Sequence, residues 1–271
     1  MSGPVRYADV NTHLDLSLGE ELPTDRPTLS QVVPLVSAAT QAGVTTIIQS
    51  GRDVGSSLWA VAAAAAFPTV WAAVGFHPFQ AAGADEDALA AIAALTAHPR
   101  VAAVGEIGLD YRGSVPPEVQ REVFVWHLEL ADEATLPVIV HAHQAEVDAL
   151  AFLAEHARDL TVVLHGFSMP DCLDEVVSRG FYVSFAGDVT YHELPALREA
   201  ARRVPADLLL VETDAPRMAP MSERERVNSP AQVVGTYESL AELRQLSLEE
   251  LAAQVELNVR RAFPRMGALC T

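Results

Sequence analysis

Histidines and acids recur along the chain at places suited to binding metal ions. Of the nine histidines, five stand at or just after short apolar runs, namely His13, His77, His141, His143 and His165. Glu106, in Val-Gly-Glu-Ile-Gly-Leu-Asp, and Asp214, in Val-Glu-Thr-Asp-Ala-Pro, stand at corresponding places. Imidazole nitrogens and carboxylate oxygens are common ligands of divalent cations. Their recurrence at apolar runs therefore predicts a metal site assembled from several strand ends.

Glu106 is the best candidate for a carboxylate that bridges two cations. A glutamate at the end of an apolar strand is costly to bury unless it is paired or coordinated. All 18 basic residues are arginine, and the chain has no lysine. This excludes a carboxylated-lysine bridge, and it also excludes Schiff-base chemistry, which needs a lysine amine. The bridging ligand must then be an ordinary carboxylate, and Glu106 is expected to end the fourth strand.

Asp214 and three histidines complete the predicted ligand set. Asp214 is expected to end the eighth strand, where it would bind a metal ion and take a proton from the attacking water. His141 and His165 are expected to end the fifth and sixth strands and to offer neutral imidazole to the second cation. The predicted metal site consists of His13, Glu106, His141, His165 and Asp214. A loop cap or a structural salt bridge is the alternative role for each acid.

The remaining four histidines are expected to serve packing or the surface. His98, His127 and His156 lie in or near helical segments, and His192 lies in a predicted loop. None of these positions belongs to the set that converges when parallel strands share one carboxyl-terminal face.

Short apolar runs alternate with helical segments, which predicts parallel βαβ units. The runs lack strict polar alternation, as expected of a sheet covered on both faces. We therefore expect an α/β protein, a (β/α)8 TIM-type barrel with a C-terminal helix, in which residues 1–271 form a single domain. An open doubly wound sheet is the alternative, but no Gly-x-Gly-x-x-Gly or P-loop sequence follows the first run. The expected strands are Val5–Val10, Val44–Gln49, Val70–Val74, Val101–Glu106, Pro137–His141, Thr161–His165, Gly180–Ser184 and Asp207–Glu212.

Two helix starts can be read from the sequence. Thr28-Leu29-Ser30-Gln31 fits a capping box, and Gly43 is a plausible stop for the helix that follows. Ser247-Leu248-Glu249-Glu250 fits a second capping box, which opens a terminal helix running towards Arg261.

The overall charge is acidic, with 36 Asp and Glu residues against 18 basic ones. Such a chain lacks the broad positive footprint of a nucleic-acid-binding protein. If the substrate is a phosphodiester, its charge must be met locally, and bound metal ions are the natural source. Five arginines follow predicted strands, but acids lie beside them, so solvated ion pairs are the favoured interpretation. These arginines are Arg52, Arg112, Arg217, Arg224 and Arg226.

Features of a secreted or membrane protein are not found. The first residues show no signal-peptide pattern. The longest near-apolar stretch, Leu58 to Phe67, is about half as long as a membrane span. Cys172 and Cys270 are too few for a disulfide framework. We expect a soluble cytoplasmic protein with no membrane contact and no obligate protein partner.

Several segments together resemble a known family. In order they are Asp9-Val10-Asn11-Thr12-His13-Leu14-Asp15, Gly75-Phe76-His77-Pro78, Gly105-Glu106-Ile107-Gly108-Leu109-Asp110-Tyr111, Leu136-Pro137 leading to His141, His165-Gly166-Phe167-Ser168, Glu212-Thr213-Asp214-Ala215-Pro216, Asn228-x-Pro230, and Asn258 with Phe263. Over nearly the whole chain they resemble the TatD family of metal-dependent deoxyribonucleases. The resemblance implies a barrel that binds one or two divalent metal ions. It also implies that the substrate is DNA, single-stranded or at 3′ ends, with phosphodiesters hydrolysed often from the 3′ end.

Three positions depart from the family pattern. The family usually opens with His-x-His, whereas Asn11 stands at the first position, and an amide oxygen favours Mg²⁺ or Mn²⁺ over Zn²⁺. His143 stands where arginine is usual and would hold a phosphate less firmly than a guanidinium. Arg217 replaces a common aromatic residue and adds positive charge. The predicted substrate-binding residues are His77, which would contact the scissile phosphate, His143 and Arg217. The predicted catalytic residues are Asp214, Glu106 and His77.

Two alternative functions use the same residues differently. A related metal barrel could hydrolyse an amide, ester or lactone, and the acidic charge suits a small substrate better than DNA. A degenerate barrel that binds a partner without catalysis is the other alternative, and Asn11 is its main support.

Overall fold

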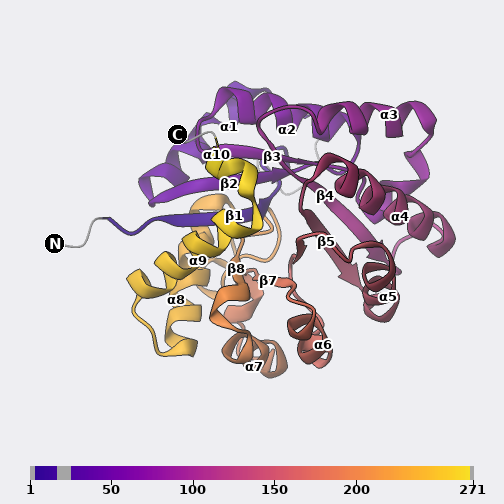
Figure 1. Cartoon of the computed structure of the whole chain (residues 1–271). Coiled ribbons are helices and arrows are strands. Elements are labelled where there is room, and N and C mark those ends of the chain that lie inside the picture. Colours follow the sequence, from indigo (N-terminus) through magenta and orange to yellow (C-terminus); the bar gives the residue numbers. More distant parts are fainter. Residues whose placement is uncertain (1–3, 17–25, 269–271) are drawn as a thin grey trace.

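The computed structural model describes residues 4–16 and 26–268 of the chain. Cys270 lies outside the described residues. Eight parallel strands form one sheet in the order of the chain, from β1 to β8, and the helices between them cover its outside (Figure 1). The strands are β1 (Tyr7–Thr12), β2 (Val44–Ser50), β3 (Val70–Val74), β4 (Val101–Asp110), β5 (Val138–His143), β6 (Val162–Leu164), β7 (Tyr182–Phe185) and β8 (Leu209–Val211).

The sheet closes where the segment after β8 returns to β1. The backbone N–H of Asp214 donates to the carbonyl oxygen of Asn11 at 3.0 Å, and the N–H of His13 donates to the carbonyl oxygen of Ala215 at 2.9 Å. The predicted TIM-type barrel is confirmed, and the open doubly wound sheet is excluded because the strand order never reverses.

Helices follow the strands in alternation. The predicted capping boxes at Thr28 and Ser247 are both present, and Gly43, with φ +92°, comes two residues after the first of these helices ends. Among the described residues, no helix is long and apolar enough to cross a membrane. The helices are α1 (Leu29–Gln41), α2 (Val54–Ala66), α3 (Glu86–Leu95), α4 (Pro117–Ala134), α5 (Glu146–His156), α6 (Leu173–Ser178), α7 (Pro195–Arg203), α8 (Val233–Arg244), α9 (Leu248–Ala262) and α10 (Pro264–Ala268).

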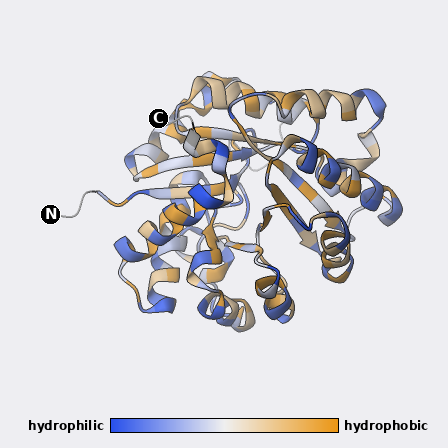
Figure 2. Ribbon diagram, in the orientation of Figure 1, coloured by the Kyte–Doolittle hydropathy of each residue, from blue (hydrophilic) through white to orange (hydrophobic). Residues whose placement is uncertain are grey.

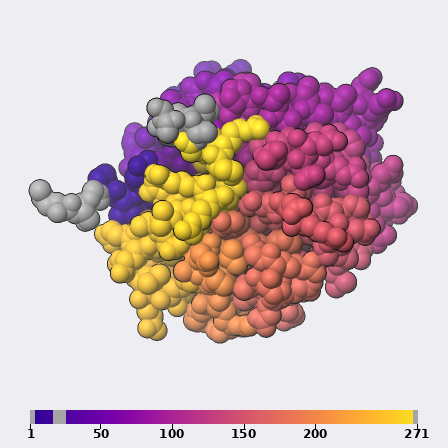
Figure 3. All heavy atoms as spheres, in the orientation of Figure 1, coloured from indigo at the N-terminus to yellow at the C-terminus, as the bar shows by residue number. Residues whose placement is uncertain are grey.

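The core lies inside the barrel and between the strands and the helices. The strand residues are largely Val, Ile, Leu and Ala and are buried on both faces. Figure 2 shows hydrophobic stretches in the central strands, and hydrophobic and hydrophilic stretches that alternate along the helices around them. The C-terminal helices α9 and α10, yellow in Figure 3, pack beside the indigo start of the chain. Residues from both ends of the chain thus stabilise the same side of the barrel.

The prediction that Glu106 ends the fourth strand is wrong. β4 continues to Asp110 and pairs with β5 from Ile107 onward, after an irregularity in the register that follows Val104. Gly108 makes this possible: it has φ +132°, and a Cβ there would lie 2.0 Å from the carbonyl oxygen of His141. Only glycine fits such a close backbone approach at a positive φ. Glu106 therefore lies within the strand.

Two other predicted strand ends are also wrong. β8 ends at Val211, so Asp214 lies three residues beyond it, with φ +48°. β5 continues past His141 to His143, because its last residues pair with the extended end of β4. His13, directly after β1, and His165, directly after β6, stand where a strand has just ended, as expected.

Candidate metal centre

The predicted ligands converge at the carboxyl end of the barrel. They come from five strands or the residues just after them: His13 after β1, Glu106 in β4, His141 in β5, His165 after β6 and Asp214 beyond β8. Four of these side chains are buried, and His141 is partly buried. A group of buried imidazoles and carboxylates is costly unless its members pair or bind a cation.

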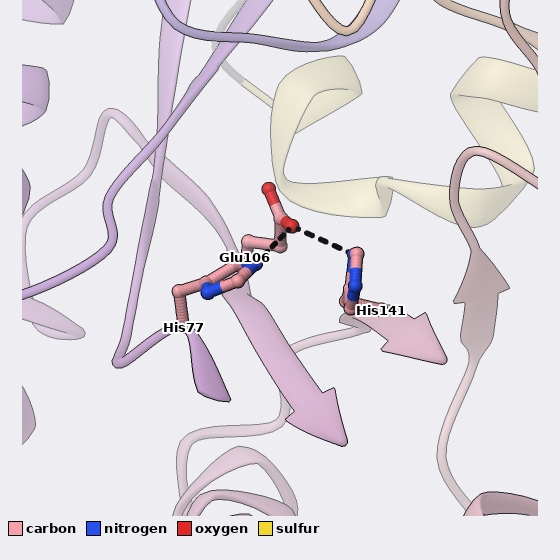
Figure 4. A group of neighbouring side chains, drawn as sticks. All are labelled: His77, Glu106 and His141. Atoms are coloured by element: carbon pink, nitrogen blue, oxygen red, sulfur yellow. Dashed lines mark ion pairs between the residues drawn. The ribbon is translucent and has the colours of Figure 1, made fainter. Parts of the chain in front are cut away.

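The carboxylate of Glu106 is the centre of the group. Its Oε1 lies 2.9 Å from His165 Nε2, 3.2 Å from His141 Nδ1 and 3.3 Å from His77 Nε2. Its Oε2 lies 3.1 Å from His13 Nε2. Figure 4 shows the rings of His77 and His141 approaching the carboxylate from different elements. Burial acts to raise the pKa of Glu106, but the charge of His165 and hydrogen bonds from the imidazoles outweigh it and hold this pKa well below its usual range. The carboxylate therefore stays ionised.

Two groups of potential ligand atoms share Glu106. In one, ligand atoms of His13, Glu106 and Asp214 all lie within 4.8 Å of one another, and in the other, Glu106 is joined by His77 and His141. His165 belongs beside the second group, since its Nε2 lies 3.0 Å from His141 Nδ1. Carboxylate oxygens and imidazole nitrogens aimed at common points suit one or two divalent cations, and Glu106 is placed to bridge them.

The hydrogen bonds of His77 make it a donor rather than a metal ligand. Its Nδ1 accepts the backbone N–H of Phe79 at 3.1 Å, so the neutral ring carries its proton on Nε2, the atom that faces Glu106. Burial lowers the pKa of His77 to about 3, so the ring is neutral. We therefore assign His77 as a hydrogen-bond donor through Nε2–H, although its Nε2 lies within reach of the ligand atoms of the second group.

Two acids that the sequence reasoning missed orient the other histidines. Asp110, fully buried, lies 3.0 Å from His141 Nε2. Glu212, also buried, lies 3.1 Å from His165 Nδ1 and accepts the backbone N–H of Gly166 at 2.7 Å. Each carboxylate accepts a hydrogen bond from the N–H of one ring nitrogen, so the other nitrogen carries no proton and is free to face Glu106. The signal was available, because both acids stand in family segments beside the predicted ligands.

Asn11 occupies the position where the family usually has histidine. Its amide oxygen accepts a hydrogen bond from the Ser50 hydroxyl, and its amide nitrogen lies 3.0 Å from His165 Nδ1 and 3.5 Å from Glu106 Oε2. The amide oxygen, which was not part of the predicted ligand set but could in principle bind a hard cation, is thus turned towards Ser50 and away from the carboxylate. His13 is held independently, because its Nδ1 lies 3.2 Å from the carbonyl oxygen of Ser50 and leaves Nε2 for the site.

A third acid missed by the sequence reasoning is Asp188, in the short 3-10 helix η3 (Gly187–Thr190). Burial, together with the charges of Glu212 and Asp214, raises the pKa of Asp188 to about 7. Burial also raises the pKa of Asp214, and Glu106 adds to this. No motif in the sequence pointed to Asp188, because only the barrel brings β7 and the segment beyond β8 together.

The mouth of the metal centre consists of two adjoining hollows. The smaller, about 110 Å³, lies over His13 and Glu106, and the larger, about 400 Å³, extends towards His143 and Ser168. Both are lined by Phe79, His141, Asp214 and Arg217. The predicted substrate-binding residues therefore all border this mouth: His77 in the smaller hollow, His143 in the larger and Arg217 in both.

The charged side chains at the mouth differ in whether they already form an ion pair with another residue. Arg52 pairs with buried Asp15 at 3.0 Å and Arg112 with Asp110 at 2.5 Å, as the interpretation of ion pairs expected. Within residues 4–16 and 26–268, Arg217 forms no ion pair. Burial and the nearby charge of Arg112 lower the pKa of His143. Arg217 is therefore, among the described residues, an arginine at the mouth whose charge is not paired with a carboxylate.

Comparisons with known proteins identify the family of the chain. Residues 8–264 match the family described as TatD related DNase. A Mycobacterium tuberculosis protein, named as an uncharacterized metal-dependent hydrolase TatD, is 37% identical over 262 residues, which cover 94% of this chain and 97% of that protein. A Citrobacter rodentium protein named as a 3′-5′ ssDNA/RNA exonuclease TatD is 33% identical over 84% of this chain and 90% of its own length.

The fold agrees as well. The crystal structure of a TatD homologue from Escherichia coli superposes with a TM-score of 0.86 at 28% identity and covers 96% of this chain and 98% of its own. Both the sequence match and the structural match extend over nearly the whole chain. The protein is therefore a member of the TatD family of metal-dependent hydrolases.

Proposed function

We propose that this protein is a divalent-metal-dependent nuclease that removes nucleotides from the 3′ end of single-stranded DNA. The observation that carries the proposal is Glu106, a buried and ionised carboxylate whose two oxygens face two separate sets of ligand atoms. A paired site of this kind suits the hydrolysis of a phosphodiester, because charge must be neutralised on both sides of the phosphorus. The relative from Citrobacter rodentium carries the matching name of a 3′-5′ ssDNA/RNA exonuclease.

Each set of ligand atoms would hold one ion. Glu106, His141 and His165 would hold one, and His13, Glu106 and Asp214 the other. When bound, Mg²⁺ or Mn²⁺ would activate water and neutralise charge on the phosphodiester oxygens. The first set contains two imidazole nitrogens and therefore also suits Zn²⁺. The experiment below accordingly compares Zn²⁺ with Mg²⁺ and Mn²⁺.

The chain's own residues would handle the proton and the substrate. Asp214 would accept the proton of the attacking water, a role that suits a carboxylate whose pKa is raised. His77 would donate from Nε2–H to a phosphate oxygen, because its Nδ1 is already occupied by the Phe79 N–H. Arg217 would bind the phosphate, and His143 would add a neutral hydrogen-bond donor.

The test uses metal-free protein, 5′-labelled single-stranded DNA and Mg²⁺, Mn²⁺ or Zn²⁺ in turn. We expect stepwise shortening that a chelator abolishes. Glu106→Gln and Asp214→Asn should each reduce the rate at least about 100-fold. Glu193→Gln, which changes an exposed acid paired with Arg224, is the matched control and should retain the wild-type rate. DNA left intact with every metal would refute the proposal.

A small-molecule hydrolase is the second candidate, and one observation favours it. Arg217 is the single rim arginine without an ion pair in the described part of the chain, and one cation suits a small anionic ester or lactone. Turnover of such substrates without DNA cleavage would decide for this candidate. Failure to bind any divalent ion would instead favour a non-catalytic barrel. The cytoplasmic location and the absence of an obligate protein partner stay predictions.

A further inference from the structure

Phe79 is an exposed aromatic side chain at the metal centre. It lies in the 3-10 helix η1 (Pro78–Gly83), two residues after His77, and 37% of its surface is exposed. It lines both hollows of the mouth. An aromatic ring left open beside charged ligands offers a flat apolar surface to whatever enters the site.

The ring of Phe79 is held in place by its neighbours. A Cβ at position 113 would lie 2.6 Å from two of the ring carbons, so the ring occupies space that only Gly113 leaves. The ring also packs against that of His77 in a T-shaped arrangement, with centroids 4.9 Å apart. The backbone N–H of Phe79 donates to His77 Nδ1. A ring fixed in this way loses little conformational entropy when a ligand stacks on it.

The two hollows beside Phe79 differ in what they can hold. The smaller hollow, of about 110 Å³, is below the usual range of ligand pockets, roughly 300–1,000 Å³. The larger hollow, of about 400 Å³, lies within that range. Its lining includes Phe79 together with Asp214 and Arg217 at the metal centre. A ligand there would meet both an aromatic ring and a guanidinium group.

We propose that Phe79 is the stacking surface for the base of the 3′-terminal nucleotide, which occupies the larger hollow. Its phosphate would then lie between Arg217 and the metal centre. This inference rests on the proposed nuclease function and adds how the substrate is recognised. Stacking uses the flat face that every base shares, so recognition would be indifferent to sequence.

The charge of the protein supports recognition by stacking. The chain carries 36 acidic residues against 18 basic ones, and Arg217 is the unpaired guanidinium at the mouth among the described residues. Affinity for DNA therefore cannot come from many phosphate contacts. A single phosphate contact on a single strand gives a log–log salt slope of about −0.7. Because KM varies inversely with the binding constant, we expect log KM to rise with the logarithm of monovalent salt concentration with a slope of about +0.7.

The test is a double-mutant cycle between Phe79 and the terminal base. Wild type, Phe79→Ala and Phe79→Trp are assayed on two oligonucleotides that differ only in the 3′-terminal residue, which is a thymidine or an abasic tetrahydrofuran. Loss of the base should lower kcat/KM of the wild type about 10- to 100-fold. Phe79→Ala should lose a similar factor on the thymidine substrate and little on the abasic one, whereas Phe79→Trp should retain the preference.

Controls separate stacking from structural effects. Leu246→Ala removes a similarly exposed apolar side chain, 39% exposed and outside both hollows, and should leave both rates unchanged. The result that overturns the inference is an equal rate of the wild type on both oligonucleotides, or an equal loss on both in Phe79→Ala. If the wild type cleaves neither oligonucleotide with any metal, the nuclease function fails as well.

Discussion

Replacing Asp110 with asparagine is expected to weaken metal binding although Asp110 is not itself a predicted ligand. Its Oδ2 accepts from His141 Nε2 at 3.0 Å and from the guanidinium of Arg112. Its Oδ1 accepts from the backbone N–H of Arg112 at 3.0 Å and from Arg112 Nε at 2.9 Å. Every one of these donors requires an oxygen, and the amide of asparagine has only one.

Either orientation of the amide leaves a conflict. If the oxygen faces His141, the NH₂ group meets the backbone N–H and Nε of Arg112. If the oxygen faces Arg112, His141 Nε2–H loses its acceptor, and the tautomer that frees Nδ1 for a cation is no longer favoured. Changing such an orienting partner lowers metal affinity by about 10- to 100-fold, which corresponds to roughly 1.4–2.8 kcal/mol.

The assay is calorimetric titration of metal-free protein with Mn²⁺. Asp174→Asn is the matched control, because Asp174 also pairs with an arginine, Arg203, but on exposed residues of α6 and α7. It should bind Mn²⁺ like the wild type. Thermal unfolding of each variant shows that it is folded. A folded Asp110→Asn protein whose Mn²⁺ affinity stays within about twofold of wild type would refute the orienting role.

Two further predictions concern stability. The pKa of Asp188 is raised to about 7, so the folded protein retains a proton there that the unfolded chain loses above about pH 4. Metal-free protein should therefore lose stability as pH rises from about 4 to about 8, by up to roughly 4 kcal/mol. Asp188→Asn should flatten this dependence in unfolding experiments with chelator, and an unchanged slope would contradict it. The buried Tyr237 hydroxyl of α8 lies 3.1 Å from both the backbone nitrogen and the carbonyl oxygen of Ala8 in β1. Tyr237→Phe should therefore lower the free energy of unfolding by about 1–2 kcal/mol without changing Mn²⁺ affinity, as urea titration and calorimetry would show; equal urea midpoints would count against this role.

The sequence by itself determined the barrel and the types of ligand. Alternating apolar runs and helical segments required parallel strands, and the periodic recurrence of histidine and acid at those runs placed the ligands at one end. The absence of lysine left Glu106 as the bridging candidate. These conclusions depend on the local pattern of residue types, which can be read directly from a single sequence.

The tertiary structure alone decided how the ligands are oriented. The register shift and Gly108 carry β4 past Glu106 to Asp110, which places Asp110 opposite His143 and beside His141. Which nitrogen of each imidazole faces the centre depends on hydrogen bonds to residues from other strands, such as Glu212 for His165. The environment of Asp188 and the exposure of Phe79 likewise arise between elements distant in the chain. Such contacts have no local signature, because they depend on distances that only the closed barrel sets.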